Sequence, residues 1–219
     1  MRTVDALKPP QFDEAFRARL HELMVWRRDV RRFRPDPIED AVLERLIAAA
    51  CLAPSVGLSQ PWRFVIVDEP ARRAAVLENF RQSNREALAA YGAGNDATRY
   101  ARLKLAGLEE APRQLAVFAD LAAAEGRGLG RRTMPQTAQY SVVAAICNLW
   151  LAARAEGIGV GWISILDPGA VRAALDAPDA WDLVGYFCIG RPSQADDTPE
   201  LEREGWERRQ PLDRFIVRR

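Results

Sequence analysis

Apolar residues recur at helical spacing near the start of the chain. They lie three or four residues apart, which predicts an amphipathic helix over about residues 12–26. The members of this stripe are Phe12, Phe16, Leu20, Leu23 and Met24. The run WRRDVRRFR, residues 26–34, then breaks the pattern, so the helix should end there.

A second helix is predicted from the residues at its two ends. Asp36 can cap it, Pro37 suits its first position, and Glu39 completes a D-x-x-E capping box. The helix should end near Ala53, because Pro54 disfavours a helical conformation at the residue before it.

Short apolar runs and longer periodic segments alternate over the rest of the chain. The runs predict four strands, at 63–67, 114–119, 160–165 and 183–189. The periodic segments predict helices at 71–90, 98–110, 136–156 and 168–175. This order, without repeats or a linker, predicts one α+β domain over residues 1–219, a sandwich with a central mixed β-sheet flanked by helices. A charged, extended C-terminal tail over 196–219 should end in a strand-like stretch at 215–217.

The predicted helix over 136–156 is apolar on most of its faces. Such a helix is buried on more than one side, and in a chain of 219 residues this favours a subunit interface. Gly157 is expected to end the helix as a C-cap residue.

The charge balance narrows the class of protein. Thirty-one basic residues stand against 30 acidic ones, for a formal net charge of +1, which disfavours a general nucleic-acid binder. Lys8 and Lys104 are the two lysines, so the other 29 basic residues are arginines. Genomic base composition explains most of them. Some are candidates for anion binding, because the guanidinium group matches phosphate in a bidentate way.

Cysteine and histidine usage disfavours several kinds of site. Cys51, Cys147 and Cys188 are scattered without a C-x-x-C pair, which predicts reduced, buried thiols of a cytoplasmic protein. His21 is the single histidine, in a predicted surface helix, which disfavours both a zinc site and a catalytic triad. The start MRTVDALKPPQ has no apolar signal region, and no apolar stretch reaches membrane-spanning length.

Five arginines crowd the eight residues 27–34. The run is equally consistent with a solvated basic turn and with a phosphate clamp, in which two or three guanidinium groups meet one dianion. Asp29 lies inside the run. It either pairs with its neighbours or acts as a general base whose pKa is lowered by the surrounding positive charge.

Two further segments carry candidate binding groups. Residues 53–62 (APSVGLSQPW) predict either a stiff loop that presents Ser55, Ser59 and Gln60 or an ordinary connection between helix and strand. Residues 157–168 begin with three alternating glycines, which would permit close approach of the backbone to a flat ligand. No predicted strand leads into a Rossmann or P-loop glycine motif.

Taken together, these segments resemble the nitroreductase family of flavin mononucleotide (FMN) proteins. That family has R-R-S-x-R-x-F after a helix, here at 27–33, and P-S-x-x-x-x-Q-P-W, here at 54–62. It also has G-I-G-x-G-W after a long helix, here at 157–162, and R-R-x-P-L in a basic tail, here at 208–212. The resemblance extends from about residue 12 to the end of the chain. It implies a nitroreductase-like sandwich and a homodimer whose FMN sites are shared between the subunits.

The chain departs from the family pattern at one position. Asp29 stands where most members have serine. Together with G-W-I-S-I-L-D-P at 161–168, it resembles the subgroup that makes 5,6-dimethylbenzimidazole, the lower ligand of vitamin B12. That subgroup uses reduced FMN as its substrate and fragments it with molecular oxygen, releasing the benzimidazole and a four-carbon sugar phosphate. The resemblance implies the same reaction here, with NAD(P)H used indirectly through a separate flavin reductase.

The resemblance also implies which residues form the site. Asp29 and Ser164 would be the catalytic residues, with Asp29 as a base that a serine there could not replace. Tyr91–Leu105 would form a lid, hinged at Gly92 and Gly94, that keeps water out. FMN would be held by Arg27, Arg28, Asp29, Val30, Arg31, Gln60, Ile163 and Ser164, by Arg208 or Arg209 at the phosphate, and by Ser55 across the dimer interface.

Two alternatives remain on the sequence alone. An ordinary NAD(P)H-dependent FMN nitroreductase or flavin reductase would oxidise NAD(P)H rapidly and reduce quinones or nitro compounds. A non-catalytic module that binds nucleic acid through its basic run would lose affinity steeply as salt is added.

Overall fold

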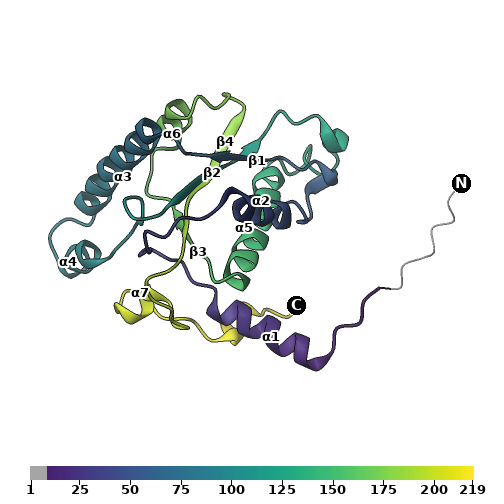
Figure 1. Ribbon diagram of the computed structural model, residues 1–219, viewed down its shortest axis with the longest axis horizontal. Helices are drawn as coiled ribbons and strands as arrows, with labels where there is room; N and C mark the ends of the chain where they lie inside the picture. The colour runs from purple at the N-terminus through teal and green to yellow at the C-terminus, as the bar shows by residue number, and fades with distance from the viewer. Residues whose placement is uncertain (1–8) are drawn as a thin grey trace, which may run out of the picture.

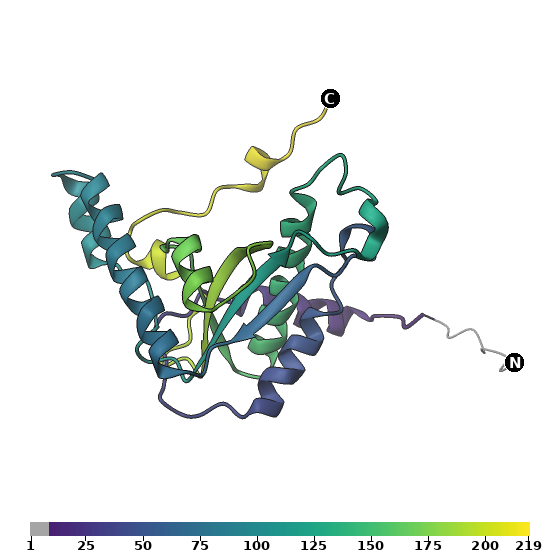
Figure 2. The ribbon, with the colours of Figure 1, turned by 90° about the horizontal axis from the view of Figure 1, so that it is seen from above.

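The computed structural model describes residues 9–219, which form one sheet with helices on both faces (Figure 1 and Figure 2). The strands are β1 (Trp62–Ile66), β2 (Arg113–Asp120), β3 (Gly159–Ile163) and β4 (Trp181–Gly190). The helices are α1 (Glu14–Trp26), α2 (Asp40–Ala50), α3 (Pro70–Ala90), α4 (Asn95–Arg102), α5 (Thr137–Ala155), α6 (Pro168–Ala174) and α7 (Glu200–Arg203). Three 3₁₀ turns are η1 (Val56–Leu58), η2 (Glu125–Gly128) and η3 (Leu212–Phe215). The prediction about a signal region falls mainly on residues 1–8, outside the described residues.

The strands lie in the order β1-β2-β4-β3, and all three pairings between them are antiparallel. The predicted mixed sheet was therefore wrong in the pairing of its strands. The long helix α5 does carry the chain across to a strand parallel to β2, namely β3. However, β4 inserts between the two and pairs antiparallel with each. One parallel bridge, from Asp29 to Val160, adds the arginine-rich segment beside β3.

Successive side chains of a strand point to opposite faces of the sheet, so the core is divided into two layers. Leu115, Val117 and Ala119 of β2 face α2 and α5, whereas Ala116 and Phe118 face the side of α3 and α6. All five of these side chains are buried. The two layers hold the sheet rigid, so groups attached to its β3 edge have a fixed support.

Two predicted helix boundaries were wrong. Asp36 does not cap a helix, because its carboxylate accepts from Arg34 Nε at 2.6 Å; α2 begins only at Asp40. The helix predicted over 98–110 corresponds to α4, which ends at Arg102. Beyond it the chain is not helical, and the Lys104 carbonyl accepts from Arg31 instead of from a helical N–H.

The predicted end of the long helix is confirmed. Gly157 has φ +70°, and the N–H groups of Gly157 and Ile158 bond back to Arg154 and Ala153. This is a Schellman cap, which satisfies the last carbonyls of α5 before β3 begins.

Several apolar groups predicted to be inside lie on the surface of the single chain. Helix α1 has no buried residue, and its stripe residues Phe16 and Met24 are exposed. Cys51 and Cys147 are exposed as well, so burial of the thiols was predicted correctly only for Cys188. The end of the tail forms η3 and then extends away from the molecule without pairing as a strand (Figure 2).

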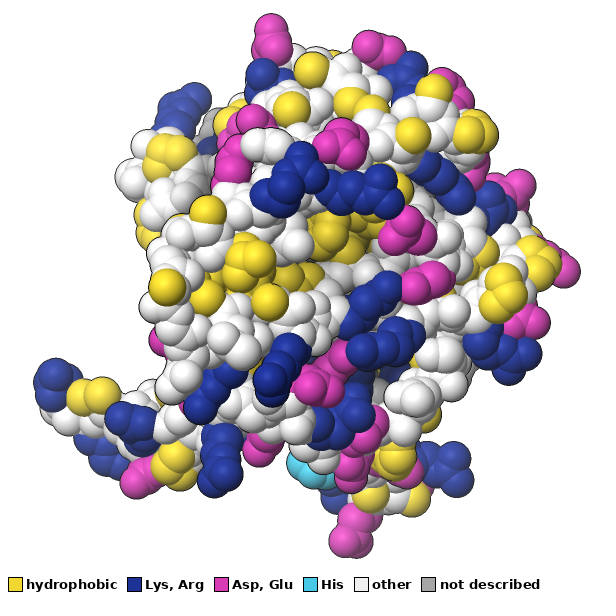
Figure 3. Space-filling model, turned by 90° about the vertical axis from the view of Figure 1, so that its left-hand side faces the viewer, with side chains coloured by type: hydrophobic (Ala, Val, Ile, Leu, Met, Phe, Trp, Pro, Cys, Tyr) yellow, Lys and Arg dark blue, Asp and Glu magenta, His cyan; other side chains and the backbone are white. Residues whose placement is uncertain are grey.

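One face of the molecule carries charged side chains of both signs (Figure 3). On the face shown in Figure 3, basic and acidic side chains alternate around an apolar hollow. Among the described residues, no helix is both long and apolar enough to cross a membrane.

Candidate functional site

The arginine-rich segment is docked on the exposed edge of β3. Val30 N–H donates to the Val160 carbonyl at 3.0 Å. This approach depends on two glycines of the G-I-G-x-G-W motif. A Cβ on Gly161 would overlap the carbonyl oxygen of Val30, and one on Gly159 would lie 2.7 Å from Val30 Cγ2. These glycines therefore make room for the protein's own chain, not for the flat ligand that the sequence suggested.

The carboxylate of Asp29 is held at both oxygens. Oδ1 accepts from the backbone N–H of Trp162 at 2.8 Å, and Oδ2 accepts from Arg31 Nε at 2.9 Å. The Asp29 side chain keeps 31% of its surface exposed. It is thus fixed in direction while part of it remains open to a ligand.

Burial raises the pKa of the Asp29 carboxyl above its usual value. This effect outweighs the positive charge of Arg31 and the hydrogen bonds from Trp162 and Arg31, all of which lower the pKa. Of the two predicted roles of Asp29, pairing with a neighbouring arginine is confirmed by the bond to Arg31, whereas the lowered pKa that accompanied the role of general base was wrong in direction. A carboxylate with a raised pKa is a stronger base, because it binds a proton more tightly.

Arginines from the two ends of the chain meet beside Asp29. Arg27, Arg28 and Arg31 line one cavity with Arg209 of the tail. Burial, and after it the charges of Arg209 and Arg27, lower the pKa of Arg28. The buried Nε of Arg28 has no hydrogen-bond partner. Converging like charges and a buried donor without an acceptor are the features expected of an anion site.

A model of the Nitroreductase family matches residues 24–191, which include the docked segment and its glycine-rich support. The chain belongs to the nitroreductase family. Solved structures agree on the fold. Iodotyrosine deiodinase bound to FMN and 3-iodo-L-tyrosine superposes with a TM-score of 0.71 at 24% identity, over 91% of this chain and 97% of that one. A nitroreductase-like protein of Streptococcus mutans gives 0.68 at 17% identity, over 92% and 98%.

Two relatives that are more similar to this chain in sequence than these solved structures share one name. A 5,6-dimethylbenzimidazole synthase of Rhodospirillum rubrum is 56% identical, over 92% of this chain and 95% of its own length. A protein of the same name from Rhodobacter capsulatus is 52% identical, over 92% and 97%.

Not all of the predicted nitroreductase site residues come together in one chain. Val56 N–H, next to Ser55, donates to Ser141 near the start of α5, while Trp150 of α5 donates to the Arg28 carbonyl. Nine residues of helix separate these contacts, which is roughly 14 Å. Gln60 lies on the same loop as Ser55, where its N–H donates to the Ser55 hydroxyl. The loop is therefore remote from the arginines of its own chain.

The other predicted site residues differ in how close they lie to Asp29. Ile163 ends β3 and is buried, whereas Ser164 follows it and is exposed, two residues beyond the Trp162 N–H that binds Asp29. Of the two tail arginines, Arg209 lines the cavity with Asp29, and Arg208 does not.

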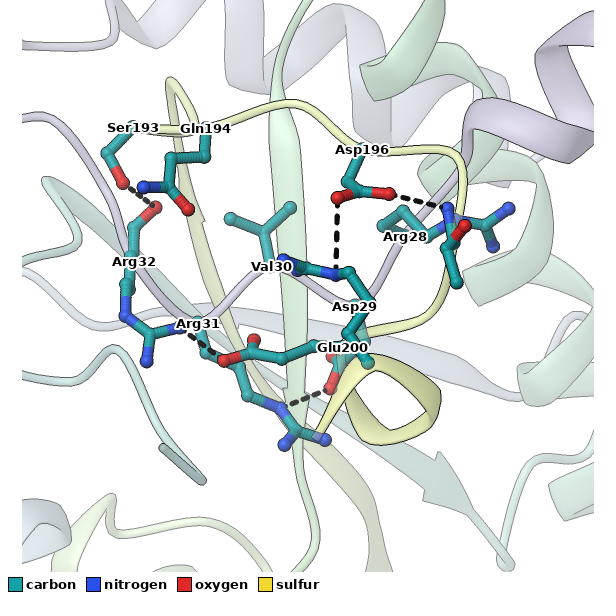
Figure 4. Close-up of a pocket in the computed structure, with 11 residues that line it drawn as sticks. Arg28, Asp29, Val30, Arg31, Arg32, Ser193, Gln194, Asp196 and Glu200 are labelled. Atoms are coloured by element: carbon teal, nitrogen blue, oxygen red, sulfur yellow. Dashed lines mark hydrogen bonds and ion pairs between the residues drawn. The ribbon is translucent and has the colours of Figure 1, made fainter. Parts of the chain in front are cut away.

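Sequence reasoning missed the acidic wall of this nitroreductase site. Glu200 of α7 pairs with Arg32 and has a side chain only 12% exposed. It lines both of the cavities that Asp29 lines, and Figure 4 shows it beside Asp29 and Arg31. The signal was present in DDTPELE, residues 196–202, an acidic run that complements the arginines.

Proposed function

We propose that this protein is a 5,6-dimethylbenzimidazole synthase, which fragments reduced FMN with molecular oxygen and releases a four-carbon sugar phosphate. The observation that carries the proposal is Asp29, an acid fixed next to an anion site, at the position where most family members have serine. The name shared by relatives at 52–56% identity supports it.

The residues present fit FMN. Its phosphate would meet Arg27, Arg28 and Arg209, and would supply the acceptor that Arg28 Nε lacks. The flavin ring would extend past Val30 toward Ile163 and Ser164. Ser55 and Gln60 would reach it from a second copy of the chain, since their loop is remote within one chain. The exposed apolar residues of α1 offer a surface for such a homodimer.

Reduced FMN would supply the carbon atoms and the electrons, molecular oxygen would be the oxidant that takes up these electrons, and the protein would supply a base and a dry site. Asp29 would be the base that accepts a proton from the ribityl carbon attached to the ring. Ser164 offers a hydroxyl that can donate or accept a hydrogen bond at the ring. The segment 91–105 excludes water, with Gly92 at φ +64° marking its bend. Reduced flavin comes from a separate reductase that uses NAD(P)H, and the protein acts in the cytoplasm.

A product assay tests the function. The protein is incubated with FMN, a separate flavin reductase, NADH and air, and 5,6-dimethylbenzimidazole is sought by mass spectrometry. We expect the product only when all components are present. Absence of product, with rapid NAD(P)H-dependent reduction of a nitro compound by the protein alone, would assign an ordinary nitroreductase instead.

The tail arginines should differ in their effect on FMN binding. Arg209→Gln should weaken it about 10- to 100-fold, because one charge-assisted bond to phosphate contributes about 1.5–3 kcal/mol. Arg208→Gln is the matched control, since Arg208 does not line the cavity, and its effect should stay within about threefold. Fluorescence quenching of FMN measures both. Equal losses in the two variants would contradict the assignment of Arg209.

Product formation should depend on pH through Asp29. The base works when deprotonated, and burial raises the pKa of Asp29, so the rate should rise with pH through a value above the usual aspartate range of about 4. Rates of product formation at saturating FMN, with the reductase in excess at every pH, measure this rise with pH. A rate that is flat down to pH 4 would contradict the role of Asp29 as a base with a raised pKa.

A further inference from the structure

Arg31 is the arginine of the cluster that binds the Asp29 carboxylate. Arg31 Nε donates to Asp29 Oδ2 at 2.9 Å, and its Nη1 donates to the Lys104 carbonyl at 3.0 Å. Its side chain is only 13% exposed. Arg28 also binds the chain, since its Nη atoms donate to the Arg27, Val25 and Asp197 carbonyls, but it binds no carboxylate and its buried Nε has no partner. Two of the nitrogens of Arg31 are therefore already engaged within the chain.

The contacts of Arg31 fix it at two ends. The Lys104 carbonyl lies in the non-helical stretch between α4 and β2, and Asp29 lies on the segment docked on β3. A guanidinium group is planar, so two bonds from different nitrogens define the plane of the fork. With Arg31 held in this way and Trp162 N–H on the other oxygen, the Asp29 carboxylate has one orientation.

We infer that Arg31 is a positioning residue for Asp29, which orients the carboxylate and links it to the 103–107 segment, and that it is not a phosphate ligand. The inference rests on the proposed function only in taking Asp29 as the base. Arg27, Arg28 and Arg209 are left as the phosphate clamp.

Other charged groups also face Asp29 and must be held constant in a test. Arg27, Arg28 and Arg32 belong to the same segment, Glu200 approaches from α7, and Arg209 approaches from the tail. Glu200 raises the pKa of Asp29, opposite to the effect of Arg31. Cys188 of β4 is near as well, but burial raises its pKa to about 12, so it stays uncharged in the range of the test.

The decisive experiment is a titration of Asp29 in the FMN-free protein, by NMR of ¹³C-labelled aspartate carboxyls, with Asp29→Asn to assign the signal. In Arg31→Gln the pKa of Asp29 should move upward, because the opposite charge is gone. At pH 7 and saturating FMN, product formation should fall tenfold or more, while FMN affinity changes less than about threefold. Arg31→Lys keeps a positive charge but loses the planar guanidinium group. Its rate of product formation should therefore lie between those of the parent and of Arg31→Gln, and the pKa of Asp29 should stay near that of the parent.

Other outcomes would overturn the inference. A tenfold or greater loss of FMN affinity in Arg31→Gln would assign Arg31 to the phosphate, and an unchanged Asp29 titration would show that the pair does not form. If Arg31→Gln does not fold, as judged by circular dichroism, Arg31→Lys decides: a parental rate would overturn the inference, and a loss of rate at parental FMN affinity would support it. The titration needs no turnover, so it stands even if the parent protein makes no benzimidazole.

Discussion

Replacing Asp29 by Asn is expected to leave FMN bound and to lower the rate of 5,6-dimethylbenzimidazole formation by about 10²- to 10⁴-fold, the usual contribution of a general base. The amide oxygen of Asn can still accept from Trp162 N–H, so the segment stays docked on β3. The amide has no basic oxygen for a proton. The affinity for FMN should change by only a few fold, because the phosphate contacts come from arginines.

Two further variants sharpen this prediction. Asp29→Ser replaces the carboxylate by a hydroxyl, which is not a base at neutral pH, and should bind FMN while making no product. Asp36→Asn is the matched control: Asp36 is an aspartate near the same run, paired with Arg34 on the surface, and its loss should leave the rate unchanged. Mass spectrometry of the product and fluorescence titration with FMN provide the two readouts. Parental rates in Asp29→Asn would show that another group is the base.

From the sequence we could predict which residues approach one another at the site, but not the direction in which the pKa of Asp29 shifts. The family motifs predicted that Arg27, Arg28 and Arg31 approach Arg209, which lies 178 positions after Arg31, and the structure brings these residues to one cavity. Their roles toward FMN stay predictions. The direction of the Asp29 pKa shift was not predictable in this way. It depends on how deeply the docked segment is buried, and neighbouring arginines in the sequence suggest only the opposite effect.

Longer-range structure limited the prediction elsewhere. The capping box at Asp36 failed for a local reason instead, because the side chain of Arg34, two residues earlier, takes the carboxylate. The mixed sheet failed because nothing in the order of elements shows that β4 inserts between β2 and β3. The alternating glycines were recognised as sites of close approach, but only the fold shows that the approaching group is Val30.

The second large effect is expected for Gly161→Ala, which should both destabilise the protein and weaken its binding of FMN. The added Cβ overlaps the Val30 carbonyl oxygen, which is backbone and cannot rotate away. Overpacking of this kind costs about 3 kcal/mol. For a chain of this size, that cost lowers the melting temperature by about 6–12 °C. Displacing Val30 also displaces Arg28, two residues earlier in the same docked segment and part of the proposed phosphate clamp, so FMN affinity should fall more than tenfold.

Gly169→Ala is the control for the loss of a glycine. Gly169 lies in α6, away from the docked segment, and a Cβ there meets nothing closer than Asp167 Oδ1 at 3.3 Å. Its effect on stability should stay within about 1 kcal/mol in either direction, because alanine favours a helix. Thermal unfolding without FMN separates the loss of stability from the loss of FMN affinity, because in the absence of FMN only the docking of the segment on β3 affects the melting temperature. If Gly161→Ala melted with the parent and bound FMN normally, the segment would not be held by β3, and the fixed direction of the Asp29 carboxylate would lose its physical basis.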